Sequence, residues 1–309
     1  MTRMIHQAAL YGSDAEFLAM AVTFVRDGLE RGEPVLVTTT SGNLTLLGEA
    51  LGDEAGRVDY AESAYFGRRT ALRATGFLRY WQRNAGHERV RILAEPVWAG
   101  RSPRDVLAWK RMESGLNLIL EGTGIWMICP YDTRTAGPGI VADAMRTHPS
   151  LSSDGRRISA SPAYADPVTF IGECDAAPLP EAPATAVSAS LGDLQSVRRF
   201  VTGQAGRSGL TGERVTMLAL AAHEASRYLE TPLTARMWET FGALVCDLRA
   251  DREIAAGPLA GFTPPGLEER PEDGLWVARQ ICDHVDIRTG GGSCTVRLQT
   301  ATWRLQESA

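Results

Sequence analysis

The chain has 309 residues, of which 44% are hydrophobic and 22% are charged, and its formal net charge is −5. This length predicts about two domains of roughly 150 residues each. The composition is typical of a folded globular protein and excludes disordered, collagen-like and disulfide-stapled chains. The acidic balance excludes a broadly basic surface, so we expect no direct contact with nucleic acid.

The sequence predicts neither a membrane span nor a secretory signal. No apolar run approaches the roughly 18 residues that a membrane helix needs, and residues 1–6 are not followed by the apolar core of a signal peptide. The five cysteines are widely spaced and include no CxxC pair, which favours neither disulfides nor a zinc site. We therefore expect a cytoplasmic protein without a metal site.

Helix and strand patterns alternate over the first 150 residues. Asp14 is expected to cap the first helix, and Pro103 lies at a first helical position, where its missing N–H costs nothing. Pro130 is expected to end the last strand. The expected helices cover residues 14–31, 41–51, 70–85 and 102–120, and the expected strands cover residues 34–40, 58–60, 90–94 and 125–129. Apolar strands in repeated βα units predict an α/β fold whose mostly parallel sheet has helices on both faces.

A second domain is expected after a linker. Residues 173–190 contain three prolines and few bulky apolar side chains, so they predict a linker between domains at 1–172 and 191–309. The second domain begins with two helices, from Leu194 and from near Thr211, and continues with strands at 243–248, 285–288 and 294–298 and a helix at 275–282. Residues 290–293 are expected to form the hairpin between the last two strands. This order predicts a two-layer α/β sandwich.

Candidate binding residues lie in the loops that follow the N-terminal strands. Open α/β sheets bind ligands beyond the carboxyl ends of their strands. The sequence contains no P-loop motif there. Aromatic side chains are expected to wall an apolar pocket, a carboxylate to add one polar contact, and two residues near the amino end to join them. These candidates are Trp98, Tyr131, Glu95, His6 and Tyr11. The alternative is that the aromatic side chains are packing residues and His6 a capped surface residue.

Taken together, these segments resemble the MEDS domain, a sensory module named for methanogen and methylotroph regulators. The resemblance covers about residues 5–150. It implies a RecA-like α/β core and a sensor of an unidentified small molecule. It rests on an early His and on segments 11–18, 28–37, Glu95-Pro96-x-Trp98, Cys129-Pro130-Tyr131-Asp132 and His148-Pro149.

The C-terminal half resembles the GHKL ATPase domains of anti-sigma factor kinases, which have the Bergerat fold. The resemblance covers about residues 190–304 and rests on segments 197–201, 220–225, 244–249, 258–261 and 274–283. It implies a sigma factor or an anti-sigma antagonist as partner, and a homodimer. It also implies that Glu224 is the relic of a general base, and that nucleotide, where still bound, would contact Glu224, Asp251, Gly274 and Leu275.

The departures from the GHKL pattern predict loss of ATP use. Tyr228 stands where the family has the Asn that holds Mg²⁺, and a phenol cannot replace that hard oxygen ligand. Ala250 stands where an Asp accepts from adenine, with Asp251 one residue away, and Arg252 replaces the following Gly. Asp273, beside Gly274, would repel phosphates. We therefore expect no cofactor, with ATP and Mg²⁺ bound only where the altered site still works.

The leading hypothesis is a signalling regulator in which a small-molecule sensor controls a pseudokinase that acts by protein contact. The first alternative is an active ATP-dependent serine/threonine kinase of the anti-sigma type with Glu224 as base. The second is a sensor that binds a metal or redox cofactor through His6 or Cys129. A DNA-binding factor is not favoured, because no basic stripe is present.

Overall fold

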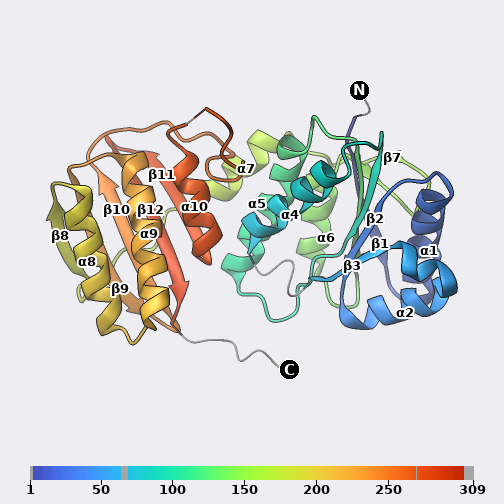
Figure 1. Cartoon of the computed structure of the whole chain (residues 1–309), viewed down its shortest axis with the longest axis horizontal. Coiled ribbons are helices and arrows are strands. Elements are labelled where there is room, and N and C mark those ends of the chain that lie inside the picture. The colour runs from blue at the N-terminus through green and yellow to red at the C-terminus, as the bar shows by residue number, and fades with distance from the viewer. Residues whose placement is uncertain (1–2, 64–68, 269, 303–309) are drawn as a thin grey trace. The chain divides into compact units, whose positions relative to one another are not determined.

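The computed structural model describes residues 3–63, 69–268 and 270–302. It divides the chain into two compact units, Met1–Cys174 and Asp175–Ala309, each with its own sheet (Figure 1). Among the helices of the described ranges, none is long and apolar enough to cross a lipid bilayer.

The N-terminal unit contains a seven-stranded sheet of order β3-β2-β4-β5-β1-β6-β7. Its pairs are parallel except for the last, β6 with β7. The mostly parallel sheet predicted from the sequence is therefore confirmed. The strands are β1 (Ile5–Tyr11), β2 (Val35–Thr39), β3 (Asp59–Glu62), β4 (Val90–Ala94), β5 (Ile125–Asp132), β6 (Ser150–Leu151) and β7 (Ser159–Ala160).

Helices cover both faces of this sheet, with α1 and α2 on one face and α4, α5 and α6 on the other (Figure 1). The prediction that Asp14 caps the first helix is wrong: Ser13 is the N-cap and accepts from the Glu16 N–H, and Asp14 is the first helical residue. The expected helix start at Ser102-Pro103 is confirmed, and Ser102 and Asp105 make a reciprocal capping box there. The helical segments are α1 (Asp14–Glu30), α2 (Ser41–Leu51), the 3-10 helix η1 (Gly52–Arg57), α4 (Thr70–Arg83), α5 (Pro103–Ile119), α6 (Pro138–Thr147) and α7 (Pro167–Asp175).

Two features of this sheet differ from the expectation. The sequence pattern did not predict β1, yet it lies between β5 and β6 near the middle of the sheet. The prediction that Pro130 ends β5 is wrong, because the strand continues to Asp132. The pairing of β4 with β5 stops at Leu93↔Ile128, so beyond that point only β1 pairs with β5. A proline without an N–H is tolerated where one neighbouring strand is absent.

The C-terminal unit has a five-stranded antiparallel sheet of order β11-β12-β10-β9-β8. Buried side chains of this sheet and of three helices share one hydrophobic core, which confirms the α/β class predicted for this unit. Gly290 and Ser293 pair at the predicted hairpin, where Gly291 and Gly292 have positive φ. The elements are β8 (Val187–Leu191), α8 (Leu194–Arg207), α9 (Gly212–Leu229), β9 (Leu233–Thr240), β10 (Ala243–Ala250), α10 (Asp273–Ile281), β11 (His284–Gly290) and β12 (Ser293–Ala301).

The segment predicted as a linker, residues 173–190, is more ordered than expected. Helix α7 extends to Asp175, and residues 187–190 belong to strand β8, which pairs with β9. Between them, the Arg297 guanidinium donates to the Pro180 carbonyl at 2.8 Å while it pairs with Asp247 at 2.6 Å. Backbone hydrogen bonds and a buried arginine therefore hold a segment that has little apolar surface to bury.

A fully buried arginine joins α1 to the sheet. Arg91 of β4 donates to Glu33 at 2.5 Å, to the Phe24 carbonyl at 3.1 Å and to Asp27. Its guanidinium also lies 4.3 Å from the centre of the Trp126 ring. Burial would raise the pKa of Asp27, but hydrogen bonds and charge from Arg31 and Arg91 lower it overall. The buried charge is therefore compensated on all sides.

Replacement of this arginine should destabilise the N-terminal unit. We expect Arg91→Met to cost about 3–5 kcal/mol, because two carboxylates lose their main partner. Arg31 is 62% exposed and also pairs with Asp27, so the control Arg31→Met should cost less than about 1 kcal/mol. Urea unfolding of the full chain, with amide hydrogen exchange on peptides from α1 and β4, measures both. If Arg91→Met and Arg31→Met lower the free energy of unfolding by the same amount, Arg91 is not the main partner of these carboxylates.

Candidate functional site

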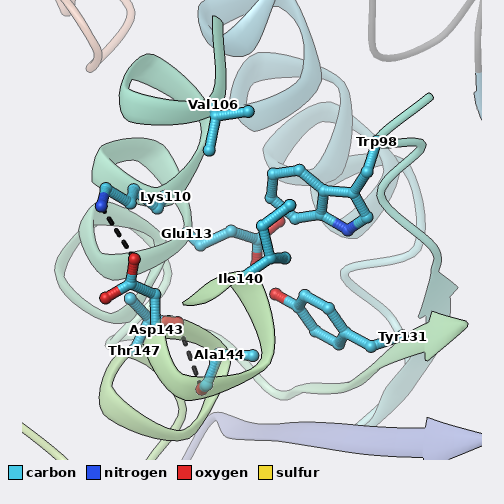
Figure 2. A pocket seen from close by; sticks show the side chains of 9 residues that line it. All are labelled: Trp98, Val106, Lys110, Glu113, Tyr131, Ile140, Asp143, Ala144 and Thr147. Atoms are coloured by element: carbon cyan, nitrogen blue, oxygen red, sulfur yellow. Dashed lines mark hydrogen bonds and ion pairs between the residues drawn. The ribbon is translucent and has the colours of Figure 1, made fainter. Parts of the chain in front are cut away.

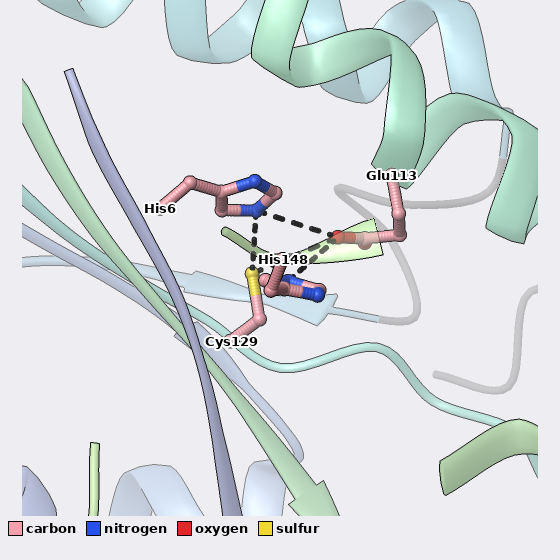
Figure 3. A group of neighbouring side chains, drawn as sticks. All are labelled: His6, Glu113, Cys129 and His148. Atoms are coloured by element: carbon pink, nitrogen blue, oxygen red, sulfur yellow. Dashed lines mark hydrogen bonds and ion pairs between the residues drawn. The ribbon is translucent and has the colours of Figure 1, made fainter. Parts of the chain in front are cut away.

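Four ionisable side chains meet inside the N-terminal unit, on the sheet face beneath α5 (Figure 3). His6 of β1 and Cys129 of β5 point to the same face, because Ala8 pairs with Cys129 and side chains alternate along a strand. Glu113 comes from the buried side of α5, and His148 is the residue that follows α6. We call these four residues the buried cluster; none is more than 1% exposed.

The facing atoms of the buried cluster are close but not in tight contact. Oε2 of Glu113 lies 3.7 Å from Nε2 of His6 and 3.5 Å from Nε2 of His148. Sγ of Cys129 lies 3.5 Å from Nε2 of His6 and 3.7 Å from Oε2 of Glu113. All four atoms lie within 4.8 Å of one another.

Hydrogen bonds from outside the buried cluster orient three of its members. The Trp109 indole donates to Oε1 of Glu113 at 3.0 Å, which leaves Oε2 for the cluster. The Asn117 amide donates to the Ser114 and Thr147 carbonyls, so its oxygen must accept from Nδ1 of His6 at 3.0 Å. Nδ1 of His148 lies 2.9 Å from the Ala144 carbonyl, to which it donates. Both histidines thus direct Nε2 at the cluster.

Burial and neighbouring charges determine the protonation states of the cluster. Burial would raise the pKa of Glu113, but the imidazoles of His148 and His6 outweigh it and hold that pKa well below its usual range. Burial and the Glu113 charge raise the pKa of the Cys129 thiol well above its usual value. Burial and the proximity of His6 lower the pKa of His148. At neutral pH the cluster therefore holds a carboxylate beside a thiol.

Arg73 of α4 is a buried cation beside the cluster. Burial lowers its pKa, and the charge of Glu113 opposes that shift. Its guanidinium donates to the Ser63 hydroxyl at 3.0 Å and to the Glu95 carbonyl at 3.2 Å, and it lies 5.0 Å from the Trp109 ring centre. Arg73 therefore connects the buried cluster to the loop that follows β4.

A narrow pocket borders the buried cluster between α5, α6 and the ends of β4 and β5 (Figure 2). It encloses about 230 Å³, including the solvent at its mouth. Trp98 and Tyr131 stack with ring centres 6.0 Å apart on its wall, and an ion pair of 2.8 Å joins Lys110 to Asp143. The other lining residues are Val106, Glu113, Ile140, Ala144 and Thr147.

A second polar network lies at the carboxyl edge of the sheet. The Tyr11 hydroxyl donates to Oε1 of Glu95 at 2.5 Å, and the Thr39 hydroxyl donates to Oε2. The Asn43 amide donates to both Oε2 of Glu95, at 2.9 Å, and the Tyr11 oxygen, at 3.1 Å. Burial and the nearby Glu95 raise the pKa of Tyr11 far above its usual value, so this phenol stays protonated.

The structure separates the five predicted ligand-binding residues into three places. Trp98 and Tyr131 line the pocket together, and Tyr131 meets the His148 ring edge-on at 5.8 Å. His6 lies behind them in the buried cluster, so it is not the surface residue of the alternative interpretation. Tyr11 and Glu95 belong to the second network. The role of all five residues in ligand binding stays a prediction.

Sequence reasoning missed Arg73 and Glu113 and did not select His148 as a site residue. The available signal was a charged residue on the apolar side of a helix. Glu113 follows Met112 and precedes the buried Leu116 on α5, and Arg73 lies between the buried Ala71 and Ala74 on α4. Charged residues are almost never fully buried unless they are paired. Such positions therefore predict a partner, although the pattern cannot identify it.

The predicted nucleotide-binding residues lie in different environments of the C-terminal unit. Glu224 of α9 pairs with Arg227 at 3.2 Å. Gly274 packs so closely that a Cβ atom would come within 2.6 Å of the Glu224 carbonyl oxygen. Leu275 is fully buried in the core, whereas the Asp251 side chain is 83% exposed and pairs with Arg249. Glu224 and Gly274 are thus neighbours, and Asp251 points to solvent.

Comparison with known proteins supports the N-terminal interpretation. Residues 5–149 match the family described as MEDS, the MEthanogen/methylotroph, DcmR Sensory domain. The match confirms the MEDS resemblance for this part of the chain and indicates a signalling regulator; no family match covers the C-terminal unit. The comparison with curated proteins gives no match.

The second network should contribute to stability through its central phenol. We expect Tyr11→Phe to destabilise the N-terminal unit by about 1–3 kcal/mol, because a buried carboxylate oxygen loses its donor. The control Tyr164→Phe changes a phenol that is 37% exposed and should cost much less. Thermal unfolding of both variants measures the difference. A Tyr11→Phe variant as stable as the control would contradict the hydrogen bond.

Proposed function

We propose that this protein is a signal-transduction regulator in which the N-terminal unit binds a small molecule and the C-terminal unit acts by contact with a protein. The observation that carries the proposal is the pocket walled by Trp98 and Tyr131, which lies within the residues that match the sensory family. Ligand pockets of this kind combine apolar walls with a few fixed polar groups.

The pocket lining suggests the chemistry of the ligand. Aromatic rings and the side chains of Val106 and Ile140 offer apolar contact, whereas Glu113 and the Lys110–Asp143 pair offer charge. The indole nitrogen of Trp98 is buried without a hydrogen-bond partner in the described part of the chain. These features favour a molecule of few atoms with an apolar body and one polar group.

The C-terminal unit is proposed to be a GHKL-like pseudokinase. Tyr228, at the position of the Mg²⁺-binding Asn, is 6% exposed and packs in the core. Ala250, at the position of the adenine-binding Asp, is buried as well. Arg252, at the position of the small Gly, donates to the Leu229 carbonyl and pairs with Glu230 at 2.5 Å. These side chains support loss of nucleotide binding, because each removes or blocks a contact that ATP needs.

Signalling then requires that ligand binding changes the affinity of the C-terminal unit for its partner. A coupling free energy of about 1–3 kcal/mol is enough for such control. The GHKL resemblance implies a sigma factor or an anti-sigma antagonist as the partner class, and pairing with a second copy of the chain. An active serine/threonine kinase is the second candidate, favoured by the retained Glu224 and its neighbour Gly274.

Filling the pocket should abolish ligand binding. Ala144 of α6 lines the pocket and is 2% exposed, whereas Ala142 lies exposed on the same helix. We expect a small alcohol, amine or carboxylic acid to raise the melting temperature of the wild type and of Ala142→Met, and to leave Ala144→Met unchanged. Thermal shift assays over such a panel measure this. A panel without any stabilising compound would contradict the ligand class, and a rise in the melting temperature of Ala144→Met as large as that of the wild type would contradict the site.

The pseudokinase proposal predicts no use of ATP. Each polar contact missing from a buried ligand costs about 1–3 kcal/mol, so calorimetric titration with MgATP should give no binding in the micromolar range. Phosphate transfer to candidate sigma-regulatory proteins should also be absent. Glu224→Gln serves as the control, because binding that persists in this variant lies elsewhere. Micromolar, Mg²⁺-dependent binding that Glu224→Gln removes would favour the kinase.

A further inference from the structure

The buried cluster has the donor atoms of a transition-metal site. It presents two imidazole nitrogens, one thiol sulfur and one carboxylate oxygen, all directed at a common point (Figure 3). Zinc accepts this mixture of ligands, commonly in tetrahedral geometry, whereas magnesium and calcium require shells of oxygen ligands. We propose that the buried cluster binds one divalent transition-metal ion of the zinc class, through His6, Glu113, Cys129 and His148.

The distances between the donor atoms fit a tetrahedron around such an ion. Zinc bonds of about 2.0–2.1 Å to nitrogen or oxygen and about 2.3 Å to sulfur give tetrahedral edges of roughly 3.3–3.6 Å. The four edges that join Oε2 of Glu113 or Nε2 of His6 to another donor atom, except the edge between His6 and His148, measure 3.5 to 3.7 Å. To hold the ion, Oε2 of Glu113 must approach Nε2 of His148 and Sγ of Cys129 by about 0.1–0.2 Å and Nε2 of His6 by about 0.3 Å. The two edges between His148 and the donor atoms of His6 and Cys129 are at most 4.8 Å long and must also shorten.

Direct ion pairs between the histidines and Glu113 explain the same geometry less well. A charge-assisted N–H···O bond is about 2.7–2.9 Å long, but the two imidazole nitrogens lie 3.7 and 3.5 Å from Oε2 of Glu113. Two imidazolium rings would also repel each other, since the centres of the rings of His6 and His148 are 4.1 Å apart. One carboxylate cannot balance both charges.

An unsatisfied nitrogen points independently to a missing ligand partner. Nε2 of His148 is buried and has no hydrogen-bond partner in the described ranges, while Nδ1 of the same ring is held by the Ala144 carbonyl at 2.9 Å. Nδ1 of His6 is held in the same way by the Asn117 amide oxygen at 3.0 Å, although its Nε2 lies 3.5 Å from Sγ of Cys129. Metal-binding histidines almost always donate their other ring N–H in this way, which fixes the tautomer with a free lone pair.

The charges of the ion and its ligands balance. A divalent ion, one carboxylate, one thiolate and two neutral imidazoles sum to zero, and a neutral assembly is the least costly one to bury. Binding releases the Cys129 proton to solvent, since the thiolate is the ligand. Because Glu113 also lines the pocket, the bound ion would fix one wall of it. This inference goes beyond the proposed ligand sensing and holds whether or not the pocket binds a small molecule.

The test uses the full chain with cobalt as a coloured substitute for zinc. Because the buried cluster is closed to solvent, the protein is unfolded in urea, stripped with a chelator and refolded under reducing conditions with Co²⁺. We expect one Co²⁺ per chain, visible bands of tetrahedral intensity and a thiolate-to-cobalt charge-transfer band, all bleached by Zn²⁺. Failure of the folded chain to bind either ion in a stoichiometric amount overturns the proposal.

Variants assign the bound ion to the cluster. Cys129→Ser should remove the charge-transfer band, and Asn117→Ala, which removes the acceptor that orients His6, should keep the band and lower the affinity about 10–100-fold. The controls Cys246→Ser, another buried thiol, and His87→Gln, an exposed imidazole, should bind as the wild type does. A band that survives in Cys129→Ser or disappears in Cys246→Ser overturns the assignment.

X-ray absorption of the zinc-loaded wild type keeps the test decisive where Cys129→Ser does not fold. We expect one sulfur neighbour at about 2.3 Å and nitrogen or oxygen neighbours at about 2.0–2.1 Å. A shell without sulfur overturns the proposal, as does one with several sulfurs.

Discussion

The N-terminal unit is organised around a carboxylate that has no access to water. Glu113 is 1% exposed, and an uncompensated ion at such a place costs several kcal/mol. Its compensation comes from β1, α4, α5 and the residue after α6, through His6, Arg73, Trp109 and His148. A core of aliphatic side chains would tolerate many packings, whereas these groups are satisfied only in one arrangement. The charge of Glu113 therefore constrains the positions of strands and helices that are distant in sequence.

The same carboxylate makes the core responsive to the pocket. Of the four residues in the buried cluster, Glu113 is the one that lines the pocket, and Tyr131 contacts both the pocket and His148. A molecule that shifts the Tyr131 ring or the Glu113 carboxylate changes the hydrogen bonds of β1 and β5 at once. A ligand would therefore need no large cavity to act on the core, because a small displacement at the pocket reaches a buried polar network in which each group depends on its neighbours.

Local signals in the sequence predicted most helices, several strands and the hairpin after Gly290. They missed β1, β8 and β9, whose residues lack a strong apolar run, and misread Pro130, whose effect depends on which neighbouring strand is present. Of the candidate site, the sequence predicted only the aromatic wall formed by Trp98 and Tyr131. Cys129 and His6 are 123 positions apart, so their meeting depends on strand order, which no local pattern encodes. Sequence alone therefore identified the region of the site but not its chemistry.

In the C-terminal unit, packing explains why the proposed loss of ATP use would be hard to reverse. Tyr228 belongs to the hydrophobic core, and its ring fills space between α9 and the sheet. An asparagine there would leave a cavity and a buried amide, each costing on the order of 1–3 kcal/mol. Arg252 similarly contributes contacts to Leu229 and Glu230. If the proposed pseudokinase assignment holds, the stability of this unit depends on the side chains that stand where nucleotide ligands would be, and their reversal would destabilise the fold.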